Sequence, residues 1–171
     1  MLKKITLFTI TLFIASCGLG QVDFWVGPTP VELTEGAKEQ VPCDFVESLR
    51  EIQKFISERF GENIANDIMS KKIVLYPDYA TPPSRVNPNL YLNGITEDGK
   101  EIHIRLLGPS ILQTALIHEM VAHLVCHKVY DDVNVNHDNA ECMKLEGEAT
   151  LQVYERTQSV RESRCAEEYW R

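Results

Sequence analysis

The sequence contains no apolar run long enough to cross a membrane as a helix. Its longest run covers residues 5–15 and is interrupted by three threonines, whereas a membrane-spanning helix needs about 20 predominantly apolar residues. Glycine and proline are not abundant, at 9 and 8 residues, and no internal repeat is visible. These absences argue against a helical integral membrane protein and against a wholly disordered chain.

Positive charge is also scarce. Lys and Arg number 17 against 25 Asp and Glu, which gives a net charge of −8. Proteins that bind nucleic acid use Lys and Arg to neutralise phosphates, so this composition argues against nucleic acid as a partner. What the chain does have is 171 residues, 44 % of them hydrophobic, which is enough for one domain with a buried core.

The N-terminus has the layout of a secretory signal peptide. Two lysines precede the apolar run, and residues 14–17 read Ile-Ala-Ser-Cys. This ending resembles the lipobox of bacterial lipoproteins. The resemblance implies that residues 1–16 are removed and that Cys17 becomes the lipidated (palmitate-bearing) N-terminus. It implies a membrane-tethered protein of the bacterial cell envelope, and Gly18, standing where Asp would favour the inner membrane, favours the outer membrane.

Hydrophobic periodicity predicts an α+β order for the rest of the chain. Residues 17–42 are rich in turn-forming residues and are expected to form the lipidated cysteine, a tether and an irregular lead-in, which leaves 43–171 as the folded domain. Apolar residues recur at helical spacing in three stretches, and residues 63–69 are expected to add a helical turn or two. The predicted helices are 43–60, 63–69, 109–129 and 138–159.

Alternating patterns predict a short antiparallel sheet. A strand is expected at 72–76, and Asp98-Gly99 is a turn signal between strands at 89–95 and 100–107. Within the last strand His103 alternates with isoleucines. Because alternate residues of a strand face opposite sides of the sheet, the His103 side chain is expected to face solvent.

Four of the five histidines lie between residues 118 and 137. Ionisable groups buried without partners are costly, and a zinc ion is a suitable partner for neutral imidazole. The zinc motif His-Glu-x-x-His places two histidines on one helix face. Here His118 and Glu119 are followed by His123, and a five-residue spacing leaves the histidines about 140° apart on a regular α-helix. Both can bind one metal only if the helix takes up an extra residue, as in a π-bulge.

A second register needs no irregularity in the helix. His123 and His127 are four residues apart and share a face, and Glu119 lies on that face as a third ligand or a base. The remaining alternative is a group of histidines with no metal.

The region around the first histidine resembles a known group of enzymes. Residues 114–120 read Thr-Ala-Leu-Ile-His-Glu-Met and follow a predicted strand, which resembles the zincin metallopeptidases and, among them, the SprT-like group. The wider His-Glu-x-x-x-His spacing also occurs in the dipeptidyl-peptidase III family. The resemblance covers residues 101–143, about a quarter of the chain. It implies a small zincin-like domain that binds Zn²⁺ through His118, His123 and His137, with Glu119 as general base.

The third ligand has a rival. Residues 144–149 resemble the Glu-Gly-x-Ala stretch of gluzincin peptidases, which would make Glu146 the ligand in place of His137. Cys126 and Cys142 flank the segment that carries His137, and a disulfide between them would hold this segment against the long helix. Cysteine ligands to the metal are the weaker alternative, because exported cysteines tend to pair.

The function expected from these features is zinc-dependent hydrolysis of a peptide bond in a peptide or protein substrate. Glu119 would take a proton from water and return it to the leaving amine. The hairpin strand beside the site could bind an extended peptide by strand addition. The alternative is a non-catalytic envelope lipoprotein, a degenerate peptidase that binds a metal or a protein partner.

Overall fold

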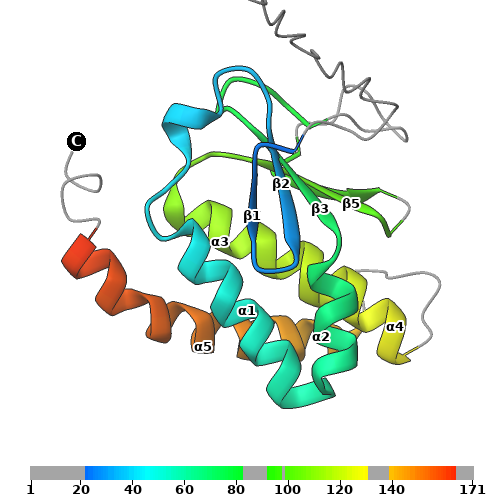
Figure 1. Cartoon of the computed structure of the whole chain (residues 1–171). Helices are drawn as coiled ribbons and strands as arrows, with labels where there is room; N and C mark the ends of the chain where they lie inside the picture. The colour runs from blue at the N-terminus through cyan, green and yellow to red at the C-terminus, as the bar shows by residue number, and fades with distance from the viewer. Residues whose placement is uncertain (1–21, 83–91, 98, 131–138, 165–171) are drawn as a thin grey trace, which may run out of the picture.

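The computed structural model describes residues 22–82, 92–97, 99–130 and 139–164. In Figure 1 a five-stranded sheet lies against a group of helices. The strands are β1 (Phe24–Val26), β2 (Thr29–Leu33), β3 (Lys72–Tyr76), β4 (Gly94–Glu97) and β5 (Glu101–Arg105). The helices are α1 (Phe45–Phe60), α2 (Glu62–Met69), α3 (Pro109–Ile117), the π-helical segment η2 (His118–Val125), α4 (Cys126–Tyr130) and α5 (Ala140–Arg164), with a short 3₁₀ turn η1 (Lys38–Gln40).

The α+β class predicted from the sequence is confirmed, but the sheet is mixed rather than antiparallel. Its strand order is β1-β2-β3-β5-β4. The three central strands are parallel, and β1 and β4 pair antiparallel at the two edges. The connection from β2 to β3 runs through α1 and α2, because parallel neighbours need a long crossover.

Two strands lie in the stretch for which the sequence predicts a tether and an irregular lead-in. Strands β1 and β2 form a hairpin with Gly27 in its turn at a φ of 58°. Both strands are short, and Pro30 lies within β2 opposite Trp25. Because proline normally signals a loop or a strand edge, the pattern of this stretch hides its strands. Among the described residues, no helix is long and apolar enough to span a membrane.

The expectation that His103 faces solvent is wrong. Its side chain is only 6 % exposed, and the Tyr76 hydroxyl lies 3.0 Å from its Nδ1. Arg105, on the same face of β5, is also buried, and its guanidinium donates hydrogen bonds to the Asp78 carbonyl. Tyr76 at the end of β3 and Asp78 just after it therefore cover the second face of β5. The alternation within one strand does not reveal this long-range arrangement.

The core lies between the sheet and the helices. Helix α1 packs against this core through the apolar face that its sequence periodicity predicts. The helix ends just before Gly61, whose φ is 88°. Complete burial of each large apolar side chain contributes about 1.5–3 kcal/mol. The fully buried members include Phe45, Leu49, Ile52, Ile56, Ile73, Leu75, Ile102, Ile104 and Leu116.

Helix α5 is attached to the other helices near both of its ends. Near its start, Cys142 forms a disulfide with Cys126, with Cα atoms 5.9 Å apart. The sequence allows this pairing but does not choose it from the other pairings open to the cysteines. Near its end, Arg161 Nε donates a hydrogen bond of 2.6 Å to Asp44 Oδ2 just before α1, and its Nη2 donates to Gln113 Oε1 of α3. These three polar side chains are almost fully buried, so their interactions join α1, α3 and α5.

Candidate metal site

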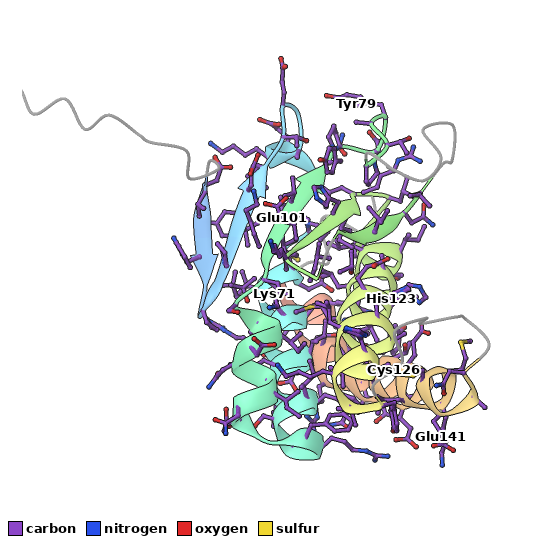
Figure 2. The ribbon with its side chains drawn as sticks, turned by 90° about the vertical axis from the view of Figure 1, so that its right-hand side faces the viewer. Lys71, Tyr79, Glu101, His123, Cys126 and Glu141 are labelled. Carbon is purple, nitrogen blue, oxygen red and sulfur yellow. A yellow bond between two sulfur atoms is a disulfide. The ribbon has the colours of Figure 1, made fainter. Side chains whose placement is uncertain are left out.

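The long helix predicted at 109–129 is interrupted by a π-helical segment. Residues His118–Val125 form η2, between the α-helical α3 and α4. Figure 2 shows His123 on η2 and Cys126 at the start of the following helix α4, beside the start of α5, where Glu141 is labelled. A π-helix has hydrogen bonds between residues five apart, so it takes up the extra residue that the His118–His123 spacing requires.

The two histidines meet at their Nε2 atoms. His123 Nε2 lies 3.0 Å from His118 Nε2, and the ring planes cross at 81°. Two nitrogens on one tetrahedral zinc, each 2.0–2.1 Å from the metal, would lie about 3.3 Å apart. The nitrogen pair is therefore close to the separation that a shared metal ion needs.

Glu119 completes a group of three candidate ligands. Its carboxylate and the two imidazoles offer ligand atoms that all lie within 4.8 Å of one another. The Glu119 side chain is only 4 % exposed, and its Oε2 accepts a hydrogen bond of 2.7 Å from Thr96 Oγ1 of β4. Sequence reasoning misses Thr96, because it assigns this residue to the hairpin turn and its partner is 23 residues away.

Glu146, on α5, contacts the other nitrogen of the His118 ring. Its Oε1 lies 3.0 Å from His118 Nδ1. A carboxylate only accepts hydrogen bonds, so Nδ1 donates and the lone pair remains on Nε2, the atom that faces His123. The same hydrogen bond raises the pKa of His118, and the negative charges of Glu146 and Glu119 raise it further. Burial of the ring acts in the opposite direction and lowers this pKa, but its effect is smaller.

The group lies in a cleft of about 700 Å³. One wall is residues 92–96, which include the first three residues of the edge strand β4, and the other comes from α3, η2 and α5. The side chains of Ile111, Ala115 and Thr114 extend the cleft along α3, away from the histidines. An extended ligand could therefore run along the strand and past the metal-ligand group.

The other residues predicted for the site are not part of the group formed by His118, Glu119 and His123 in the described part of the chain. His127 lies exposed on α4, outside the group of three that the described part of the chain brings together. His137, Cys17 and the signal peptide at 1–16 lie outside the described residues.

Two imidazoles, a buried carboxylate and a second carboxylate that orients one ring form a donor set that fits a divalent metal ion. No family model, no curated protein and no solved structure matches this chain. The geometry of the cleft is therefore the basis for assigning a function.

Proposed function

We propose that this chain is a lipid-anchored envelope protein that hydrolyses peptide bonds with a zinc ion bound by His118, His123 and His137. One observation carries the proposal: the π-helical segment brings two Nε2 atoms to 3.0 Å from each other, with a buried carboxylate beside them. Imidazole nitrogens are ligands that zinc prefers, and three protein ligands leave a fourth position open.

The disulfide supports His137 as the third ligand. In the sequence His137 is five residues before Cys142. Cys142 is bonded to Cys126, only three residues after His123, so the disulfide holds the start of α5 beside the helix that carries His123. Glu146 is less suited to the role, because it contacts the nitrogen of His118 that does not face His123.

Glu119 is the proton carrier in this proposal. When bound, zinc lowers the pKa of water and polarises a carbonyl group. The Glu119 carboxylate accepts a proton as a water oxygen attacks the peptide carbonyl carbon, and it then delivers that proton to the leaving amine nitrogen as the C–N bond breaks. Its near-complete burial keeps bulk water from competing for that proton.

The edge strand favours a peptide as the substrate. Residues 92–96 line the cleft, and β4 pairs with β5 on one side only within the described sheet. An extended peptide can bind such an edge through main-chain hydrogen bonds, which places one of its carbonyl groups beside the metal site.

The first test is the metal content of the full chain, purified in detergent micelles. We expect about one zinc per chain, lost in His118→Ala, His123→Ala and His137→Ala but kept in His127→Ala. Zinc that disappears with His127→Ala and persists with His118→Ala would contradict the proposed register and remove Glu119 from its role.

Glu119→Gln separates a peptidase from a non-catalytic metal-binding lipoprotein. The substitution keeps the size of the side chain but removes the proton acceptor. We expect zinc to remain bound while hydrolysis of a mixed fluorogenic peptide library falls by about 10²–10⁴-fold. A zinc-loaded wild type without hydrolysis would favour the non-catalytic alternative.

The anchor is tested separately. Cys17→Ser removes the thiol that would be lipidated, so the protein is expected to leave the membrane fraction and to lose labelling by palmitate. Labelling that persists in Cys17→Ser would overturn the lipoprotein assignment without touching the metal site.

A further inference from the structure

Strand β4 contacts the carboxylate of Glu119 at two positions. Thr96 Oγ1 donates a hydrogen bond to Oε2 at 2.7 Å. Two residues earlier, Gly94 packs against the same side chain, since a Cβ atom built there would lie 3.0 Å from Oε1 and 3.1 Å from Cγ of Glu119. Residues two apart in a strand share a face, so both contacts come from one face of β4.

Gly94 is needed here for space. Its φ does not lie in the left-handed region, so its backbone conformation is open to other residues. A Cβ atom would instead meet Glu119 on one side and Ile104 Cδ1, at 2.9 Å, on the other. Neither side chain can easily move away from such a Cβ atom, because Ile104 is fully buried and Glu119 is nearly fully buried.

We propose that Gly94 and Thr96 are positioning residues that fix the Glu119 carboxylate beside the metal-ligand group. This inference rests on the proposed function, in which Glu119 carries the proton. A glutamate has three rotatable bonds, and a proton acceptor displaced by about 1 Å can cost 10²-fold in rate. Gly94 allows the carboxylate to lie against the strand, and the Thr96 hydroxyl fixes its rotation.

The hairpin register sets both contacts. Gly94 pairs with Ile104 and Thr96 pairs with Ile102, both in the fully buried part of β5. Strand β4 therefore has two roles in this proposal: it lines the cleft in which the peptide would bind, and it positions the general base Glu119.

A purely structural role for Thr96 makes a different prediction. In that case its hydroxyl only satisfies a buried carboxylate, and its removal lowers stability but leaves the turnover of folded, metal-loaded protein unchanged. A positioning role lowers kcat at constant metal content and nearly constant KM, and a serine that restores the hydroxyl restores kcat.

The variants are Thr96→Val, Thr96→Ser and Gly94→Ala in the full chain. We expect Thr96→Val to lower kcat by up to about 10²-fold, Thr96→Ser to retain most of it, and Gly94→Ala to lower it through displacement of Glu119. Thr29→Val is the matched control for threonine, since Thr29 is buried and its hydroxyl bonds to the Met69 carbonyl. Gly147→Ala is the control for glycine, since a Cβ there meets no atom within 4 Å.

Crystal structures of the zinc-loaded wild type, Thr96→Val and Gly94→Ala provide a readout that does not depend on activity. We expect the Glu119 carboxylate to rotate in Thr96→Val and to shift by a few tenths of an ångström in Gly94→Ala. A carboxylate that keeps its place in both variants, or a kcat unchanged in both, would overturn the inference. If the carboxylate moves while the wild type hydrolyses no peptide, the positioning is supported and the proposed peptidase function is what fails.

Discussion

The Oε1 atom of Glu146 and the Nδ1 atom of His118 lie 3.0 Å apart, although 28 residues separate them in the chain. The contact leaves the His118 Nε2 atom directed at His123. Second carboxylates of this kind fix the tautomer and orientation of a histidine ligand, and their loss commonly costs 10–100-fold in metal affinity.

Glu146→Ala is therefore expected to weaken zinc binding by about 10–100-fold without abolishing it. Glu146→Gln is expected to lose less, because the amide oxygen still accepts a hydrogen bond from Nδ1. Competition with a chromophoric chelator measures both affinities. Glu148→Gln is the control, since Glu148 pairs with Arg59 at 3.1 Å. Complete loss of zinc in Glu146→Ala would instead identify Glu146 as a ligand.

Shortening the π-helical segment tests its role directly. Deletion of Ala122 changes the histidine spacing from five to four and turns the segment into His-Glu-x-x-His, for which a regular α-helix suffices. We expect zinc still to bind, with the flanking helices in their present register. Deletion of Thr114 from the regular helix α3 is the control, and it should disrupt packing because it rotates the preceding residues by about 100°. A folded Ala122 deletion that has lost zinc would contradict this account.

The Cys126–Cys142 disulfide is expected to stabilise the fold by about 3 kcal/mol, the value for a closed loop of this length. The double variant Cys126→Ala, Cys142→Ala should unfold at correspondingly lower urea concentration. Substitution is preferable to a reducing agent, because Cys43 is also disulfide-bonded and a thiol reductant would not discriminate. Equal urea midpoints for the wild type and the double variant would show that the bond is dispensable for stability.

Part of the stability is expected to be lost in acid through Glu101. The Lys72 ammonium, 2.7 Å from Glu101 Oε1, holds the pKa of Glu101 below its usual range. A carboxyl group whose pKa is lowered on folding stabilises the protein above the unfolded pKa of about 4.3 and loses this effect as the pH falls through the folded pKa. Since Glu101 is 38 % exposed, its contribution is at most about 1 kcal/mol.

In Lys72→Met, stability is expected to fall less steeply as the pH is lowered. The measurement is the urea midpoint of unfolding at several pH values from about 6 to about 3, the range in which Glu titrates. Lys38→Met is the control for the change in net charge, because Lys38 is exposed on η1. If the urea midpoint falls equally with pH in the wild type and in Lys72→Met, the ion pair between Lys72 and Glu101 does not cause the loss of stability in acid.

Local patterns predict the helices and the strands β3 and β5 well, but not β2, which lies in the predicted lead-in. Strand β3 and the end of α1 at Phe60 coincide with their predicted positions, because apolar periodicity is a property of a few neighbouring residues. The same reasoning fails for His103, whose environment is set by Tyr76 on a different strand.

In the candidate site, too, features that depend on neighbouring residues are predictable from the sequence, and contacts between distant residues are not. The spacing of His118 and His123 identifies the need for an irregular helix, and the structure contains one. Glu146 is visible in the sequence, but its contact with His118 Nδ1 is not, because it depends on how α5 packs against η2. Gly94 and Thr96 have no sequence signal, since their role depends on the hairpin register and on the path of a helix 23 residues away.

The two attachments of α5 hold one wall of the cleft in place. From Cys142 to Arg161 the helix spans about 28 Å, and a covalent bond at one end and a buried ion pair at the other restrain it from sliding or tilting. Glu146 lies between these two restraints and keeps a fixed position relative to α1 and α3. A ligand that reaches the α5 side of the cleft therefore meets a carboxylate supported by a rigid helix, in a position set by packing contacts far from the site itself.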